Sequence, residues 1–216
     1  MTTAEVYIAH IEKCITDAEL YKSNVTPDIL GITGFTGHKA LHFYNNLLNY
    51  TDARYLEIGT WYGSSSCAAM YKNKSVITCI DNWSEFEGPK GACLANIERY
   101  KGENTVDFIE KDCWTIQSSE LKKYNMYMYD ACHLRESHAK ALTHFVNVMD
   151  DVFIYLVDDW DWKKVQNGTY DAIESLGLKT LYKREIHMID DGTDQPCASS
   201  KSDWWNGIGI FVFSKN

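Results

Sequence analysis

Proline and long apolar runs are scarce in this sequence. Only 3 of its 216 residues are proline, and there is no low-complexity tract. No stretch approaches the roughly 18 consecutive apolar residues that a membrane-spanning helix needs. The N-terminus also lacks the basic region and apolar stretch of a signal peptide. These absences argue against a disordered arm and a membrane span, and they predict a soluble protein of the cytoplasm.

Paired cysteines and an excess of basic residues are missing as well. No two cysteines are spaced as Cys-x-x-Cys, so we expect reduced thiols. The cysteines are Cys14, Cys67, Cys79, Cys93, Cys113, Cys132 and Cys197. The formal net charge of -9 would repel a phosphate backbone. Nucleic acid is therefore not an expected partner.

Apolar and aromatic residues are abundant. They include 7 Trp and 14 Tyr, and apolar residues make up 45% of the chain, enough for one packed α/β domain. We expect helices over 4–22, 38–50, 64–71, 91–100, 136–148 and 169–176. We expect strands over 54–58, 75–80, 106–110, 124–129, 152–157, 178–189 and 207–213, with a polar loop over 190–205. This alternation predicts a doubly wound parallel sheet that ends in an antiparallel hairpin. Residues 1–50 would form a helical segment packed on a core of residues 51–216.

Acidic residues follow each of the first five predicted strands. They are Glu57, Asp81, Asp112, Asp130, Asp158 and Asp159. A single acid at such a position is ordinary because Asp favours turns, but five strands in succession favour a shared site. In this kind of sheet, ligands bind at the carboxyl ends of the strands, near the point where the strand order reverses.

The turn after the first strand reads Glu-Ile-Gly-Thr-Trp-Tyr-Gly-Ser-Ser from Glu57 to Ser65. It lacks the Gly-x-Gly-x-x-Gly pattern of dinucleotide sites, which disfavours a bound pyrophosphate. Gly59 and Gly63 still let the backbone approach a smaller, carboxylate-bearing group closely.

The turns after the second and third strands predict a place for a nucleoside. Asp81 stands about 20 residues beyond the first turn, where an acid can accept both hydroxyls of an adenosine ribose. Trp83 offers a flat face for the adenine or is an ordinary core residue, and the sequence leaves both open. Asp112 and Cys113 would lie near the adenine amino group.

These segments resemble class I S-adenosylmethionine-dependent methyltransferases. The resemblance rests on the segments from Tyr55 to Ser65 and from Ile80 to Lys90, and on the acids after the fourth and fifth strands. It extends from about Gly31 to the C-terminus and points to small-molecule O-methyltransferases of the macrocin and catechol types. It implies a Rossmann-like seven-stranded sheet of order 3-2-1-4-5-7-6 with strand 7 antiparallel. It also implies S-adenosylmethionine as cofactor, a small-molecule acceptor and a tendency to form homodimers.

The same resemblance implies roles for individual residues. The Gly59–Ser65 turn would hold the methionine portion of the cofactor, Asp81 its ribose and Asp112 its adenine, while the turn Gly34–Gly37 would cover it. The predicted cofactor-binding residues are Phe35, Thr36, Glu57, Gly59, Thr60, Gly63, Ser64, Ser65, Asp81, Asn82, Trp83, Asp112, Cys113 and Asp130.

The predicted catalytic end combines carboxylates with a histidine. Asp130, Asp158 and Asp159 suit Mg²⁺ or another divalent cation, which in metal-dependent relatives lowers the pKa of the substrate hydroxyl. Catechol-type relatives carry Asp-Asn where this chain has Asp158-Asp159. His133, in Asp-Ala-Cys-His, is the candidate general base because imidazole titrates near neutrality. Turn acids and a histidine at a helix start, without chemistry, are the alternative interpretation.

Four tryptophans, Trp160, Trp162, Trp204 and Trp205, are expected at the rim, as walls of an acceptor pocket or as packing for the last hairpin.

The predicted function is metal-assisted O-methylation of a sugar or phenolic hydroxyl. An NAD-dependent oxidoreductase, a cofactor-binding protein without activity and a metal-dependent hydroxylase on the same scaffold are the alternatives left open.

Overall fold

The computed structural model describes residues 1–189 and 200–215, so Cys197 and most of the predicted loop 190–205 lie outside the described residues. Seven strands form one sheet of order β3-β2-β1-β4-β5-β7-β6. The strands are β1 (Arg54–Ile58), β2 (Val76–Asp81), β3 (Thr105–Glu110), β4 (Tyr124–Tyr129), β5 (Met149–Asp158), β6 (Lys179–Ile186) and β7 (Ile208–Ser214). The first five are parallel, and β7 runs antiparallel to both β5 and β6. The predicted strand order and terminal hairpin are confirmed.

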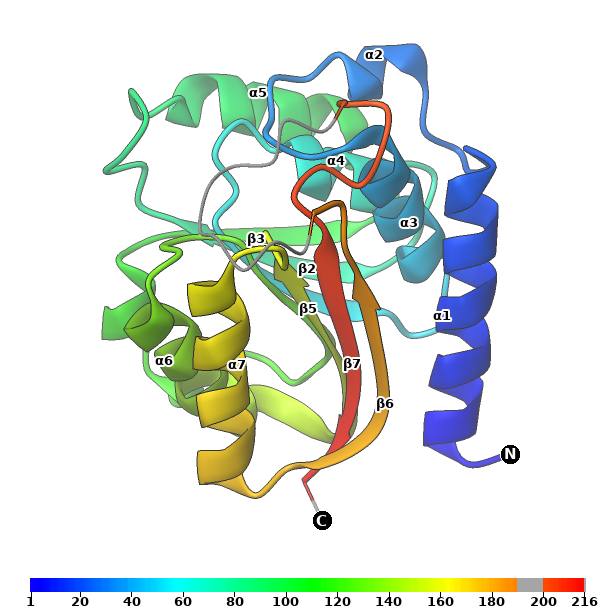
Figure 1. Cartoon of the computed structure of the whole chain (residues 1–216). Coiled ribbons are helices and arrows are strands. Elements are labelled where there is room, and N and C mark those ends of the chain that lie inside the picture. The colour runs from blue at the N-terminus through cyan, green and yellow to red at the C-terminus, as the bar shows by residue number, and fades with distance from the viewer. Residues whose placement is uncertain (190–199, 216) are drawn as a thin grey trace.

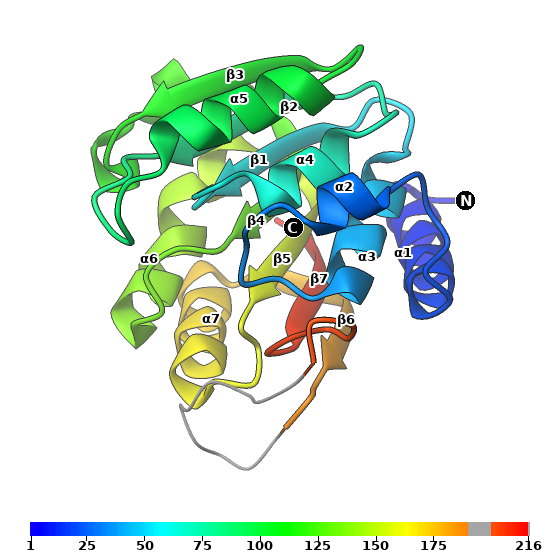
Figure 2. The same ribbon diagram turned by 90° about the horizontal axis from the view of Figure 1, so that it is seen from above.

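Helices cover both faces of the sheet (Figures 1 and 2). The helices are α1 (Thr3–Glu19), α2 (Pro27–Leu30), α3 (His38–Leu48), α4 (Ser64–Met70), α5 (Lys90–Tyr100), α6 (Arg135–Phe145) and α7 (Lys163–Leu176). One core lies between the sheet and α1, α3, α4 and α5, and the other between the sheet and α6 and α7. None of the helices in the described part of the chain has the length and hydropathy of a membrane span.

The central strands are buried on both faces, which explains their nearly continuous apolar sequence. Every residue of β4 is buried. Met126 and Met128 face the core beneath α3 and α4, whereas Tyr127 and Tyr129 face the core beneath α6 and α7. Because side chains alternate along a strand, one short segment supplies both cores.

The structure departs from the predicted elements at three places. Helix α7 begins at Lys163, whereas the predicted helix began at residue 169. The prediction missed the first turns because they are mostly polar and contain Gly168. A Cβ on Gly168 would lie 2.2 Å from the Arg135 carbonyl oxygen, so this glycine permits close packing of α6 and α7. Strand β5 begins at Met149, and residues 146–148 of the predicted helix form the short 3₁₀ helix η3 (Val146–Val148). Helix α2 and the 3₁₀ helices η1 (Cys113–Thr115) and η2 (Ser118–Glu120) were not predicted, since each is too short for periodicity.

Candidate functional site

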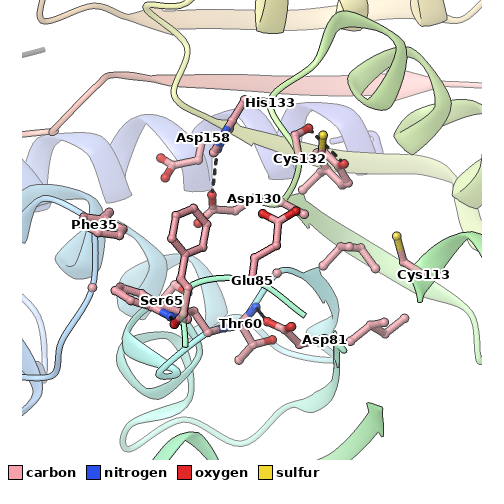
Figure 3. A pocket seen from close by; sticks show the side chains of 18 of the residues that line it. Phe35, Thr60, Ser65, Asp81, Glu85, Cys113, Asp130, Cys132, His133 and Asp158 are labelled. Carbon is pink, nitrogen blue, oxygen red and sulfur yellow. Dashed lines mark hydrogen bonds and ion pairs between the residues drawn. The ribbon is translucent and has the colours of Figure 1, made fainter. Parts of the chain in front are cut away.

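The carboxyl ends of the parallel strands open into a cavity of about 630 Å³ (Figure 3). This volume is that of a pocket for a small molecule. His133, Asp158 and Asp159 line it together with most of the predicted cofactor residues. Those residues are Phe35, Thr36, Gly59, Thr60, Ser64, Ser65, Asp81, Asn82, Trp83, Asp112, Cys113 and Asp130.

Glu57 and Gly63 are predicted cofactor residues that do not line the cavity. Glu57 is fully buried behind the first turn, where one carboxylate oxygen accepts hydrogen bonds of 2.7 Å from the Ser65 and Ser66 hydroxyls. Burial raises the pKa of Glu57 to about 7. Glu57 therefore supports the turn from below, while Gly63 supplies its left-handed backbone at φ 81°.

Gly59 brings the first turn against the end of β4. Its φ is 88°, and a Cβ there would stand 1.7 Å from the carbonyl oxygen of Asp130. Only glycine permits both this backbone conformation and this approach. The contact places the turn and the Asp130–His133 segment on neighbouring walls of the cavity.

Asp81 joins the turns after β1 and β2. Its Oδ2 accepts hydrogen bonds of 2.8 Å from the backbone N–H groups of Thr60 and Trp61, and its Oδ1 accepts one of 2.7 Å from Trp83 N–H. These bonds occupy about three of the roughly four lone-pair positions of a carboxylate. Asp81 thus has a structural role that the sequence did not reveal, beside the ribose contact that stays a prediction.

The predicted adenine end combines packed and open residues. Trp83 stacks on Phe108 with ring centroids 4.8 Å apart, and its indole N–H donates to the Trp61 carbonyl at 2.9 Å. One face of Trp83 is therefore core packing, although the residue also lines the cavity. Asp112 caps η1 by accepting a hydrogen bond from Trp114 N–H.

The predicted catalytic residues meet after the ends of β4 and β5. His133 Nε2 lies 2.8 Å from Asp159 Oδ2 and 3.9 Å from Asp130 Oδ1. One ligand atom from each of these residues lies within 4.8 Å of the other two. Asp158 lines the same cavity but is not part of this group.

Burial and the neighbouring carboxylates have opposite effects on the pKa of His133. Burial alone would lower the pKa of His133, but the nearby carboxylates of Asp130 and Asp159 outweigh it and raise the pKa to about 10. The ring is therefore an imidazolium at neutral pH, not a base, while both carboxylates hold it. Burial, reinforced by Asp130 and Asp159, raises the pKa of Asp158 well above its ordinary value.

The four rim tryptophans separate into two kinds. Trp162 and Trp205 line the cavity, and Trp162 meets the His133 ring edge-on at 4.9 Å. Trp160 and Trp204 are fully buried and do not line the cavity, so packing is the role of Trp204 among the two left open by the sequence. Trp160 packs against Gly209, whose own Cβ would clash with the indole, and Trp204 donates a 2.6 Å hydrogen bond to Glu19.

Trp61, Glu85 and Phe86 line the cavity beside the predicted Phe35, but were missed as site residues. Phe35 stacks on Trp61 with ring centroids 4.7 Å apart, and Phe86 meets both rings edge-on. Glu85 precedes Phe86 in the β2–α5 loop and also lines the cavity (Figure 3). The aromatic-rich segments carrying Trp61, Glu85 and Phe86 were visible in the sequence, but nothing local in them indicated which side chains face a ligand.

Comparison with known families supports the geometry. Residues 56–160 match a family model described as a methyltransferase domain. The match contains the Gly59 turn, Asp81 and the Asp130–His133 segment, and the sheet order is that of the methyltransferase fold. The chain has the fold of class I S-adenosylmethionine-dependent methyltransferases.

Solved methyltransferase structures share this fold at low identity. A proposed caffeoyl-CoA O-methyltransferase from Staphylococcus aureus is 19% identical with a TM-score of 0.57, over 94% of this chain and 92% of that one. The O-methyltransferase from Bacillus cereus, solved in complex with SAH, is 12% identical with a TM-score of 0.53, over 97% and 90%. TrmN from Thermus thermophilus is 11% identical with a TM-score of 0.58, over 88% and 52%.

Coverage differs among the similar structures. The chain spans about half the length of TrmN and of two further structures, 52%, 47% and 48% respectively. Identities this low establish the fold and not the substrate. A comparison with curated protein sequences gave no match.

Proposed function

We propose that this chain is an S-adenosylmethionine-dependent methyltransferase that methylates a small-molecule hydroxyl, sugar or phenolic, with the help of a divalent cation. The observation that carries the proposal is the meeting of Asp130, His133 and Asp159 in the same cavity as the Gly59 turn and Asp81. A cofactor site and a catalytic group that share one cavity are what a direct methyl transfer requires.

The residues fit the cofactor at the first turn. Gly59 lets the first turn lie directly against the Asp130 carbonyl, and Gly59, Thr60, Ser64 and Ser65 line the same cavity. These residues would hold the methionine portion, and the remaining lone pair of Asp81 would be left to accept a hydrogen bond from the ribose. Asp112 and Cys113 would flank the adenine.

The residues also fit a divalent cation. The carboxylates of Asp130 and Asp159, whose ligand atoms lie within 4.8 Å of each other, would supply the oxygen ligands that such an ion prefers, and His133 beside them would stay available as the base. When bound, the cation would lower the pKa of the acceptor hydroxyl.

Residues of the chain would move the proton and orient the acceptor. Asp130 and Asp159 hold the proton on His133, so any contact that draws these carboxylates away lowers the pKa of the ring. The free imidazole then accepts the hydroxyl proton at Nε2. When bound, S-adenosylmethionine would supply its sulfonium methyl to the hydroxyl oxygen and would leave as S-adenosylhomocysteine, with the electron pair of the broken S–CH₃ bond on sulfur. Trp162 packs edge-on against His133 and orients the ring.

The test is transfer of a labelled methyl group to a panel of phenolic and sugar acceptors. Activity should disappear with EDTA and return with Mg²⁺. Asp159→Asn should reduce it by about 100-fold or more, since a cation at a developing alkoxide contributes several kcal/mol.

Asp151→Asn is the matched control, because Asp151 lies near the beginning of β5, exposed to solvent, whereas Asp159 follows the other end of that strand. It should leave activity unchanged. Turnover that resists EDTA and survives Asp159→Asn would contradict the metal-assisted mechanism. Failure to bind S-adenosylmethionine in calorimetry would contradict the proposed function as a whole.

A further inference from the structure

Asp159 lies on an unfavourable backbone directly after β5. Its φ is 54°, in the left-handed region that costs energy for a residue with a Cβ. The residue is only 7% exposed, so water reaches little of its carboxylate. Contacts within the fold must therefore hold both this turn and the carboxylate that it carries.

Asn206 holds this turn at two points. Its side-chain amide donates a hydrogen bond of 2.5 Å to Asp159 Oδ1, and its carbonyl oxygen accepts one of 2.9 Å from the backbone N–H of Asp161. The next carbonyl, that of Gly207, accepts a bond of 3.4 Å from the Trp160 N–H. Asn206 is 4% exposed and lines the cavity. The segment that leads into β7 thus positions the turn that follows β5.

The two carboxylate oxygens of Asp159 consequently have separate partners. Asn206 binds Oδ1, whereas Oδ2 lies 2.8 Å from His133 Nε2. Rotation of the carboxylate would deprive the buried Oδ1 of its donor, which is unfavourable because that oxygen would also have little access to water. The Asn206 amide therefore keeps Oδ2 directed at His133.

The backbone around Asn206 is itself fixed. The Gly207 N–H donates a hydrogen bond of 3.2 Å to the carbonyl of the fully buried Trp204, which closes a tight turn around Asn206. Gly207 has a φ of 80°, and a Cβ there would lie 2.4 Å from the Ile186 carbonyl oxygen. A donor on such a constrained backbone can hold a carboxylate in one orientation.

We propose that Asn206 is a positioning residue of this site, whose amide fixes the Asp159 carboxylate in the orientation that a divalent cation and His133 require. This inference rests on the proposed function, because it concerns the same site. A carboxylate that is already held loses little freedom when it binds a cation, and removal of such a supporting partner lowers metal affinity by about 10- to 100-fold. The amide is uncharged, so it leaves the negative charge of Asp159 available to the cation.

The first test measures Mn²⁺ binding by calorimetry, with Mn²⁺ as the probe for the cation. Asn206→Leu keeps roughly the size of the side chain but removes the donor, so the affinity for Mn²⁺ should fall by about tenfold or more. The variant should keep its affinity for S-adenosylmethionine, since Asn206 acts through Asp159. Asn206→Ala gives the same comparison if the leucine variant does not fold.

Asn125→Leu is the matched control. Asn125 is also a buried asparagine, 2% exposed, and its side chain bonds the backbone of Asp52 and Arg54 at the beginning of β4, away from the cavity. This variant should lose stability in urea as the Asn206 variants do, but it should bind Mn²⁺ like the wild type. Unchanged Mn²⁺ affinity in the Asn206 variants overturns the inference. Equal losses in the Asn206 and Asn125 variants, or a loss of S-adenosylmethionine affinity with Asn206→Leu, overturn it as well.

Crystal structures of the wild type and of the Asn206 variant separate this inference from the proposed function. In the variant the carboxylate of Asp159 should turn, so that Oδ2 leaves His133 Nε2. An unchanged contact between Asp159 and His133 overturns the inference even if the wild type is a metal-dependent methyltransferase. If the wild type binds no Mn²⁺, the metal-assisted function fails, while the position of Asp159 in the variant still decides the role of Asn206.

Discussion

At the scale of single residues, buried carboxyl groups support the site without facing it. Glu57 is fully buried at the end of β1, and its second carboxylate oxygen has no hydrogen-bond partner among the described residues. Burial raises the pKa of Glu57 from 4.5 to about 7, so the folded protein keeps a proton that the unfolded chain has lost between these values. The stability that this proton contributes is complete below pH 4.5 and is lost as pH rises through 7.

Glu57→Gln should remove this dependence on pH. Glutamine keeps the shape and can still accept from the Ser65 and Ser66 hydroxyls. Between pH 4.5 and 8, the unfolding free energy of the wild type should fall relative to the variant by on the order of 3 kcal/mol. Urea unfolding across this range measures the difference, and parallel profiles for the two proteins would show that Glu57 is ionised in the folded state.

At the scale of the element, the two glycines of the first turn have different tasks. Both have positive φ, 88° at Gly59 and 81° at Gly63. A Cβ on Gly59 would overlap the Asp130 carbonyl at 1.7 Å, whereas one on Gly63 would have Cys93 Sγ as its nearest neighbour at 3.4 Å. Backbone strain applies to both positions, but steric exclusion applies only to Gly59.

Gly63→Ala should therefore cost roughly 1–2 kcal/mol, the cost of a left-handed backbone for a residue with a Cβ. Gly59→Ala should cost about 4 kcal/mol or more, the range of the most disruptive single substitutions. It should also abolish S-adenosylmethionine binding, because the first turn and the end of β4 must separate. Urea unfolding and calorimetry distinguish the two variants, and equal losses would contradict the assigned packing.

Strands were predictable where burial imposes composition. Strand β4 matches its prediction over Tyr124–Tyr129, since a strand buried on both faces needs an apolar run between polar turns. The beginning of α7 was not predictable, because Gly168 is there for a close contact with α6, and no local sequence pattern reveals such a contact. The periodicity of apolar residues shows which face of a helix or strand is buried, but it does not show which other element packs against that face.

The position of the site was predictable from the sequence, but the contacts within it were not. Acids at strand ends predicted that Asp81, Asp130, Asp158 and Asp159 would share one site, and all four line the same cavity, because the carboxyl ends of parallel strands share one edge. The protonated state of His133 depends on two distances across the fold, so it could not be predicted. Trp160 and Trp162 are separated by one residue, yet only the structure shows which of them is buried.

At the scale of the whole molecule, the N-terminal segment is part of the core and not an appendage. Helix α1 packs on α3 and also contacts β5 and β7. Near its end, Glu19 accepts a 2.6 Å hydrogen bond from the buried Trp204 indole and pairs with Lys39 at 2.7 Å. Lys39 also pairs with Asp203 at 3.0 Å. The first and last parts of the chain are thus joined before β7 enters the sheet.

Because these contacts join the two ends of the chain, we predict one cooperative unfolding transition. The urea unfolding curves measured by far-ultraviolet circular dichroism and by tryptophan fluorescence should coincide. Glu19→Ala leaves the Trp204 N–H without its acceptor and should lower the midpoints of both signals together, by about 2 kcal/mol in unfolding free energy. Glu98→Ala is the control, because its pair with Lys101 is exposed and should contribute no more than about 0.5 kcal/mol. Two separate transitions, with only the first shifted by Glu19→Ala, would instead mean that residues 1–50 unfold independently of the sheet.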